Sequence, residues 1–189
     1  EKYIWDLKIE PKLERLDEEM KHYINVCKEK LGMVPNVILA NASDKDRLKN
    51  FVNFYNRLML KEGHLSKLER EMIAVVVSSC NKCFYCLIAH GAAVRQLSKN
   101  QYLGDELMIN YRSANLNKRH KLMLDFSYKL TENPSKVDNS DRNILREAGF
   151  SEEEILEIVE VASFFNMSNR IAAGTDMRPN AEYHNMGRE

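Results

Sequence analysis

The 189-residue sequence has few of the residues that interrupt helices, and it carries no excess charge of either sign. It holds only 7 glycines and 4 prolines, and alternating β-branched residues are nearly absent. These scarcities argue against a protein built from strands and tight turns. The 28 basic residues cancel the 28 acidic ones, so no general positive field attracts a nucleic acid or an anionic membrane surface. We expect neither as a partner.

Long apolar runs are absent as well. None approaches the roughly 18 to 20 residues that a membrane-spanning helix needs. The N-terminal stretch 1–6 lacks the charged and then apolar layout of a secretory signal. We therefore expect a soluble, cytoplasmic protein. Its length fits a single domain over residues 1–189, in which residues 175–189 form an irregular packing tail.

What the sequence does contain is helical periodicity. Apolar residues recur three and four positions apart along most of the chain, which predicts an all-α fold. Ser43, Ser66 and Ser151 are candidate helix caps, the last two within capping boxes, and Asn133-Pro134 should break a helix. The expected helices span about 12–31, 43–63, 66–80, 83–97, 104–112, 117–130, 138–149 and 151–171.

The cysteines are the most informative residues for chemistry. Three of the four, Cys80, Cys83 and Cys86, lie within seven positions, whereas Cys27 stands alone on the apolar face of the first expected helix. Cysteines so close together cannot link distant segments. In a reducing compartment such a cluster indicates redox catalysis or metal binding. We expect Cys27 to be a buried small hydrophobe and Cys80 to be a buried residue at a helix end.

Cys83, Cys86 and His90 have the spacing of residues on one helical face. Positions i, i+3 and i+7 align on a helix that advances about 100° per residue, so the two thiols and the imidazole can meet. A Cys-x-x-Cys pair at a helix start beside a base has a lowered pKa, which supplies a nucleophilic thiolate. We assign the attack to Cys86, one turn before His90, and the resolving role to Cys83.

A histidine that acts as a base needs an acidic partner to orient it. Two glutamates on the preceding helix are candidates. Glu69 is used locally by the capping box that begins at Ser66, whereas Glu71 has no local task. We therefore place Glu71 beside His90 in a proton relay.

Residues 68–78 followed by 81–90 resemble the core motif of alkyl hydroperoxidase D and the carboxymuconolactone decarboxylase superfamily. The shared features are a glutamate before a helix of small apolar residues, a Cys-x-x-Cys, and a histidine four residues after the second cysteine. The chain departs from alkyl hydroperoxidase D at Tyr85, where a histidine often precedes the second cysteine. Cys80 is the second departure, because it extends the run of cysteines.

The resemblance implies an alkyl hydroperoxidase D-like helical bundle that forms a homo-oligomer. It also implies a thiol-dependent, peroxidase-like oxidoreductase in which Cys86 attacks the peroxide, Cys83 is its partner, and Glu71 and His90 relay the proton. The substrate would be a small hydroperoxide or a disulfide, and an external dithiol would reduce the oxidised pair. No bound cofactor is required.

Other interpretations of the same residues remain open. Together with His90, the three clustered cysteines mimic the ligand spacing of a zinc or iron–sulfur site. However, the fourth ligand is a histidine, no proline follows it, and helix-forming residues continue where a cluster-binding loop is expected, so we expect no metal. A second alternative is that the thiols are ordinary core residues. The fold further admits a lyase that acts on a lactone, and a non-enzymatic thiol redox sensor.

Overall fold

The computed structural model describes residues 3–188, and over this range the regular elements are all helices. The all-α fold class is therefore confirmed. The longer helices are α1 (Glu18–Leu31), α3 (Lys45–Tyr55), α4 (Lys67–Cys80), α5 (Phe84–Ser98), α7 (Lys118–Glu132) and α9 (Glu152–Gly174). The shorter ones are α2 (Asn36–Asn41), α6 (Leu103–Asn110) and α8 (Asn139–Glu147). Single turns of 3-10 helix cover Leu13–Arg15, Tyr111–Ser113, Pro134–Lys136 and Ala181–His184, and a π-helical segment covers Asn56–Leu60.

Local signals set most of the helix boundaries. Ser66 and Ser151 cap α4 and α9 through complete capping boxes, as expected, and Asp138 caps α8 in the same way. The glutamate of the first box, Glu69, is also paired with Arg119 at 2.5 Å and with His120 at 3.4 Å. The start of α4 is consequently fixed by both its own sequence and the neighbouring α7.

The expected boundaries were wrong at two places near the N-terminus. The first helix does not start near residue 12, because a 3-10 turn there gives way to extended backbone before Asp17 caps α1. The second does not begin at Ser43, because Asp44 accepts the hydrogen bond from the first turn of α3 and Ser43 is buried instead. This helix then widens into the π-helical segment, where the amide of Lys61 donates to the carbonyl of Asn56 at 3.0 Å.

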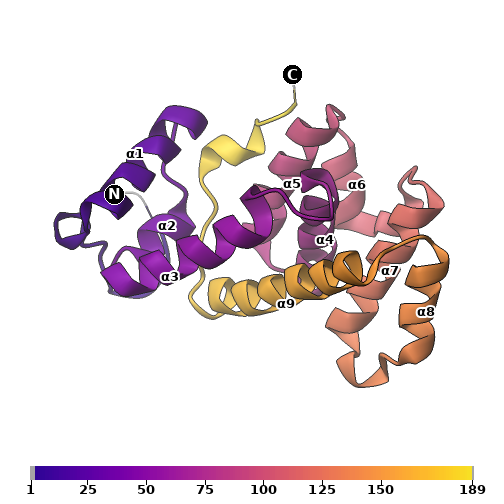
Figure 1. The fold of residues 1–189 in the computed structure, drawn as a ribbon. Coiled ribbons are helices and arrows are strands. Elements are labelled where there is room, and N and C mark those ends of the chain that lie inside the picture. Colours follow the sequence, from indigo (N-terminus) through magenta and orange to yellow (C-terminus); the bar gives the residue numbers. More distant parts are fainter. Residues whose placement is uncertain (1–2, 189) are drawn as a thin grey trace.

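Helix α4 forms the centre of the fold (Figure 1), in contact with α5, α6, α7 and α9. Every residue from position 69 to position 78 is buried, which accounts for the apolar run 72–77. The three charged residues that precede this run, Glu69, Arg70 and Glu71, are each paired with an opposite or titratable partner. Helices α5 and α6 approach closely, since a Cβ added at Gly104 would lie 2.6 Å from the carbonyl oxygen of Gly91. The central helix thus carries residues that are held rigidly by packing on all sides.

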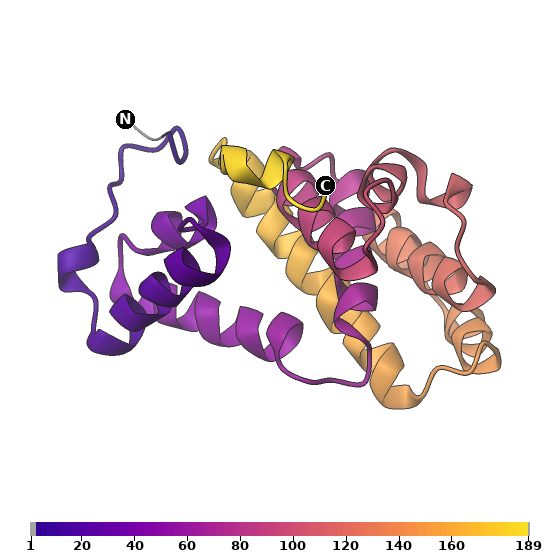
Figure 2. The same cartoon turned by 90° about the horizontal axis from the view of Figure 1, so that it is seen from above.

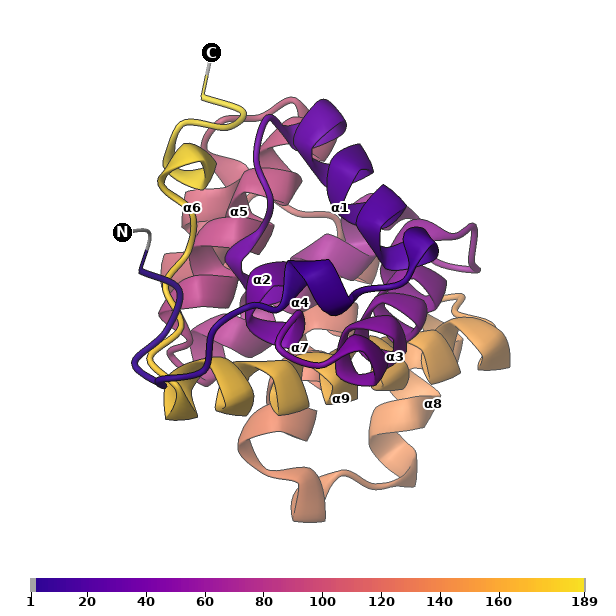
Figure 3. The same cartoon turned by 90° about the vertical axis from the view of Figure 1, so that its left-hand side faces the viewer.

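Helices α1, α2 and α3 gather on one side of the molecule, α4 to α8 lie on the other, and α9 runs between the two groups (Figure 2). Figure 3 shows the molecule from the side of α1, α2 and α3. The first group has its own small apolar core, made by residues such as Met20, Ile24, Leu48 and Val52. Residues 175–188 follow α9, contact the start of α2 and then α5, and so connect the two groups. Asn180 binds the amide of Asn36 and the carbonyl of Val34, and the buried Arg95 binds the carbonyls of Tyr183 and Met186.

Among residues 3–188, no helix is both long enough and apolar enough to cross a membrane.

Candidate active site

Helices α4 and α5 form a hairpin that brings the expected site residues together. The turn between them is short, with Lys82 in the left-handed conformation (φ 56°) and Cys83 as the N-cap of α5. Residues on facing turns of such a hairpin become neighbours although they are far apart in sequence. Glu71 on α4 and His90 on α5 occupy facing turns in this way.

The carboxylate of Glu71 contacts the imidazole of His90 directly. Glu71 Oε2 lies 2.6 Å from His90 Nδ1, and the two side chains are only 8% and 12% exposed. The ring of His90 also packs edge-on against Phe165, with 4.5 Å between ring centroids. Because the carboxylate accepts a hydrogen bond at Nδ1, the histidine is held in one orientation and Nε2 is left for other chemistry.

Both thiols of the Cys-x-x-Cys pair are buried and reduced, each 2% exposed. The pKa of Cys83 is lowered to about 7, mainly by a hydrogen-bonding interaction with the Cys86 thiol, and the ring of His90 also contributes. The same interaction, together with burial, raises the pKa of Cys86 well above its ordinary value. The pair therefore loses its first proton near neutral pH, and the charge rests mainly on Cys83.

The polar residues Ser168 and Asn169 of α9 support the thiols. Asn169 is 1% exposed; its amide nitrogen donates to Ser78 Oγ at 2.9 Å, and its amide oxygen accepts from Asn81 at 3.0 Å. These two contacts fix the orientation of the amide. Hydrogen bonding to Asn169 lowers the pKa of both cysteines, and hydrogen bonding to Ser168 lowers that of Cys86.

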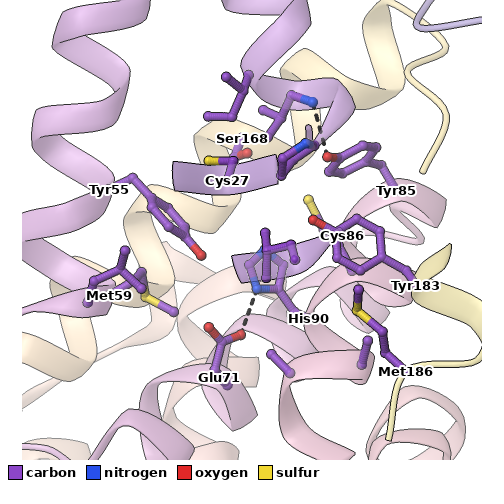
Figure 4. A pocket seen from close by; sticks show the side chains of 18 of the residues that line it. Cys27, Tyr55, Met59, Glu71, Tyr85, Cys86, His90, Ser168, Tyr183 and Met186 are labelled. Atoms are coloured by element: carbon purple, nitrogen blue, oxygen red, sulfur yellow. Dashed lines mark hydrogen bonds and ion pairs between the residues drawn. The ribbon is translucent and has the colours of Figure 1, made fainter. Parts of the chain in front are cut away.

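A cavity of about 650 Å³ opens beside this cluster. Cys86, His90, Glu71 and Ser168 line it, and Figure 4 shows their side chains around a single hollow. Cys83 is not among the described residues that line the cavity, although its thiol interacts with the Cys86 thiol. A molecule in the cavity therefore meets Cys86 before Cys83.

Known proteins resemble this chain in sequence and in fold. Residues 46–101 match the carboxymuconolactone decarboxylase family. An uncharacterized peroxidase-related protein from Silicibacter sp. TM1040 is 52% identical over 99% of this chain and 97% of its own, with a TM-score of 0.94. This chain belongs to the carboxymuconolactone decarboxylase family. The resemblance noted from the sequence is thereby confirmed.

Other family structures extend the comparison. A peroxidase-related protein from Ralstonia eutropha JMP134, described as an alkylhydroperoxidase AhpD core, is 38% identical over 100% of this chain and 99% of its own, with a TM-score of 0.94. The debrominase Bmp8, solved with 2,3,4-tribromopyrrole, has a TM-score of 0.80 over 97% of both chains. At 17% identity, it shows only that the fold is shared. No protein of curated function matches this sequence.

The two departures from the alkyl hydroperoxidase D motif have structural explanations in this family member. The hydroxyl of Tyr85 accepts a hydrogen bond from the amide of Val37 at 3.1 Å, so it links α5 to α2. Burial raises the pKa of Tyr85 well above its ordinary value, which keeps the hydroxyl protonated. Cys80 is half-buried and does not line the cavity. No group of three or more histidine, cysteine or acidic residues suited to a metal occurs within residues 3–188.

Sequence reasoning missed Ser168, Asn169 and Tyr55 as neighbours of the catalytic candidates. Asn169 could have been found, because it is a polar residue on the stripe of α9 that otherwise buries Ala162 and Phe165. Tyr55 gives no such signal. It is the last residue of α3 and lines the cavity, and burial raises its pKa well above the ordinary value.

Proposed function

We propose that the protein is a thiol-dependent, peroxidase-like oxidoreductase that reduces a hydroperoxide through Cys83 and Cys86. The observation that carries this proposal is that Cys86 and the Glu71–His90 pair line one cavity, with the Cys83 thiol in hydrogen-bonding contact with the Cys86 thiol. A nucleophile, a base with its orienting carboxylate, and a second thiol are the groups that a peroxide-reducing dithiol requires.

The first step forms a sulfenic acid on Cys86. His90 Nε2 takes the proton of the Cys86 thiol, and the resulting thiolate attacks the outer oxygen of the hydroperoxide. The O–O bond breaks, and the alkoxide that leaves takes the proton back from His90 to become an alcohol. Glu71 stabilises the imidazolium that exists between these proton transfers. Cys86 supplies both electrons in this step.

The second step joins the two cysteines. The Cys83 thiolate attacks the sulfenic sulfur of Cys86, an S–S bond forms, and the hydroxide that leaves takes a proton to become water. The ring of His90 and the hydrogen bond to Asn169, which also lower the pKa of Cys83 and do not depend on the Cys86 thiol, favour the Cys83 thiolate in this step. In sum, two thiols and one hydroperoxide give a disulfide, an alcohol and water, and an external dithiol restores the thiols.

The test is to count thiols before and after one equivalent of hydroperoxide and to map any disulfide by mass spectrometry. We expect two thiols to disappear and to be joined as Cys83–Cys86. Cys86→Ser should abolish peroxide consumption, whereas Cys83→Ser should accumulate a sulfenic acid. Cys80→Ser is the matched control and should behave as the unaltered protein. Unchanged thiols would overturn the proposal, and the opposite behaviour of the two serine variants would exchange the roles of the cysteines.

The Glu71–His90 pair also suits proton transfer without thiols, which is the chemistry of a lactone-directed lyase. Lyase activity that survives in the Cys83→Ser/Cys86→Ser variant would favour that function. A redox sensor would instead show a change of oligomer size on oxidation without turnover of peroxide. Size-exclusion chromatography of the reduced and oxidised protein, run beside the thiol assay, separates the sensor from the catalyst.

A further inference from the structure

The cavity meets solvent at a mouth of defined composition. Of the residues that line the cavity, those with exposed side chains come from the ends of three helical segments and the start of α4. They are Lys30 and Leu31 of α1, Leu60 of the π-helical segment, Lys67 of α4, and Gln96 and Leu97 of α5. The mouth is thus lined by three leucines, two lysines and a glutamine.

The two lysines at this mouth form no ion pair within the described residues. Lysines form ion pairs at Lys21, Lys49 and Lys129 in the described chain, whereas Lys30 and Lys67 form none. The one carboxylate that lines the cavity is Glu71, and it is buried against His90. The entrance therefore offers two ammonium groups that have no carboxylate partner, and an anionic group placed there would pair with them.

The wall between the mouth and Cys86 is mostly apolar. It includes Val26, Ile38, Phe51, Met59, Phe164 and Phe165. The volume of about 650 Å³ falls in the range of roughly 300 to 1,000 Å³ that is usual for sites of small organic ligands. Hydrogen peroxide would leave most of this surface without a contact. A molecule with a long apolar body would bury it.

We propose that the substrate is an amphiphilic organic hydroperoxide, with an apolar chain in the cavity and a carboxylate at the mouth, where Lys30 and Lys67 offer unpaired ammonium groups. This inference rests on the proposed function, and it adds the substrate class. The hydroperoxide group, carried along the chain, reaches Cys86, whose thiol is oxidised to the sulfenic acid while the peroxide becomes a hydroxyl group. A hydroxy fatty acid and water are the products after Cys83 closes the disulfide.

The test measures thiol loss in a single turnover of the reduced protein, which requires no external reductant. The probes are linoleic acid hydroperoxide, its methyl ester and tert-butyl hydroperoxide. We expect the acid to saturate the protein at the lowest concentration. The Lys30→Met/Lys67→Met variant keeps the apolar stems and should raise the half-saturating concentration of the acid by roughly five- to twentyfold. The ester and tert-butyl hydroperoxide should change less than about twofold, since neither carries a charge.

The matched control is Lys28→Met/Lys61→Met, which removes two exposed lysines next to the mouth that do not line the cavity. It should leave the half-saturating concentration of the acid unchanged. High salt should weaken the preference for the acid in the unaltered protein, because exposed charges are screened. Equal half-saturation by acid and ester, or an equal effect of both lysine pairs, would overturn the inference while the peroxidase proposal stands.

A measurement of fatty acid binding to a variant that lacks both thiols distinguishes the two proposals. In the Cys83→Ser/Cys86→Ser variant, calorimetry with decanoate, laurate and myristate should show affinity that rises about two- to fourfold for each added methylene group. This binding should weaken when Lys30 and Lys67 are replaced. Such binding without thiol loss from the unaltered protein would support the ligand class and refute the peroxidase proposal. No binding of any of the three fatty acids would overturn the ligand class.

Discussion

Replacement of Cys86 by alanine should raise the pKa of Cys83 from about 7 to its ordinary value of 9.0 or above. The hydrogen-bonding interaction with the Cys86 thiol is the largest effect that lowers this pKa, and burial acts in the opposite direction. Alanine has no donor, so burial would be left without its main counterweight. A rise of about two units means that the thiolate loses about 3 kcal/mol of stabilisation. At pH 7, the ionised fraction should fall from about one half to about one in a hundred.

The assay is the ultraviolet absorbance of the thiolate as a function of pH, because it needs no reagent to reach the buried sulfur. Burial raises the pKa of Cys27 and Cys80, so neither ionises before the pair. In the unaltered protein, thiolate should therefore appear as the pH rises through about 7 and should be lost below it.

Two variants complete this experiment. Cys86→Ser keeps a hydrogen-bond donor and should shift the titration less than Cys86→Ala does. Cys80→Ser should leave the first ionisation unchanged, because Cys80 does not belong to the pair. If Cys86→Ala still ionises near pH 7, the Cys83 thiolate is stabilised by other groups, and the assignment of its low pKa to the second thiol is refuted.

Three further predictions follow from particular contacts. Glu71→Gln removes the carboxylate that lies 2.6 Å from His90. This variant should lose thiols to peroxide about 10²-fold more slowly and with an altered pH profile. An unchanged rate and pH profile would contradict the relay. Glu69→Gln should lower the free energy of unfolding by about 1 to 2 kcal/mol at neutral pH. In the unaltered protein, the hydrogen bond to His120 lowers the pKa of the Glu69 carboxyl from 4.5 to about 2. The stabilisation by Glu69 is therefore complete above pH 4.5 and lost as the pH falls toward 2. Urea unfolding at several pH values can check this dependence. Gly104→Ala should destabilise the protein by about 1 to 3 kcal/mol in the same urea assay, because its Cβ would lie 2.6 Å from a backbone oxygen of α5; a stability equal to that of the unaltered protein would refute the close packing of α5 and α6.

Several helix boundaries were predictable from local signals. The capping boxes at Ser66 and Ser151 operate within four consecutive residues, and Gly32 adopts the left-handed conformation (φ 70°) that ends α1. Helix α2 was missed because its support is not local. The amides at its start bind the side chains of Asn180 and Tyr85, which are distant in sequence. A helix of six residues has too few positions to show a period of its own.

The sequence by itself determined the candidate site on α5, because the backbone of a helix fixes the relation of Cys83, Cys86 and His90. It also singled out Glu71 by elimination. Only the tertiary structure decided that the lowered pKa belongs to Cys83 while Cys86 lines the cavity, and that α9 supplies Asn169 beside both thiols. The reason is physical: burial and the approach of groups from other helices set these properties, and helix packing depends on contacts between residues far apart in the chain.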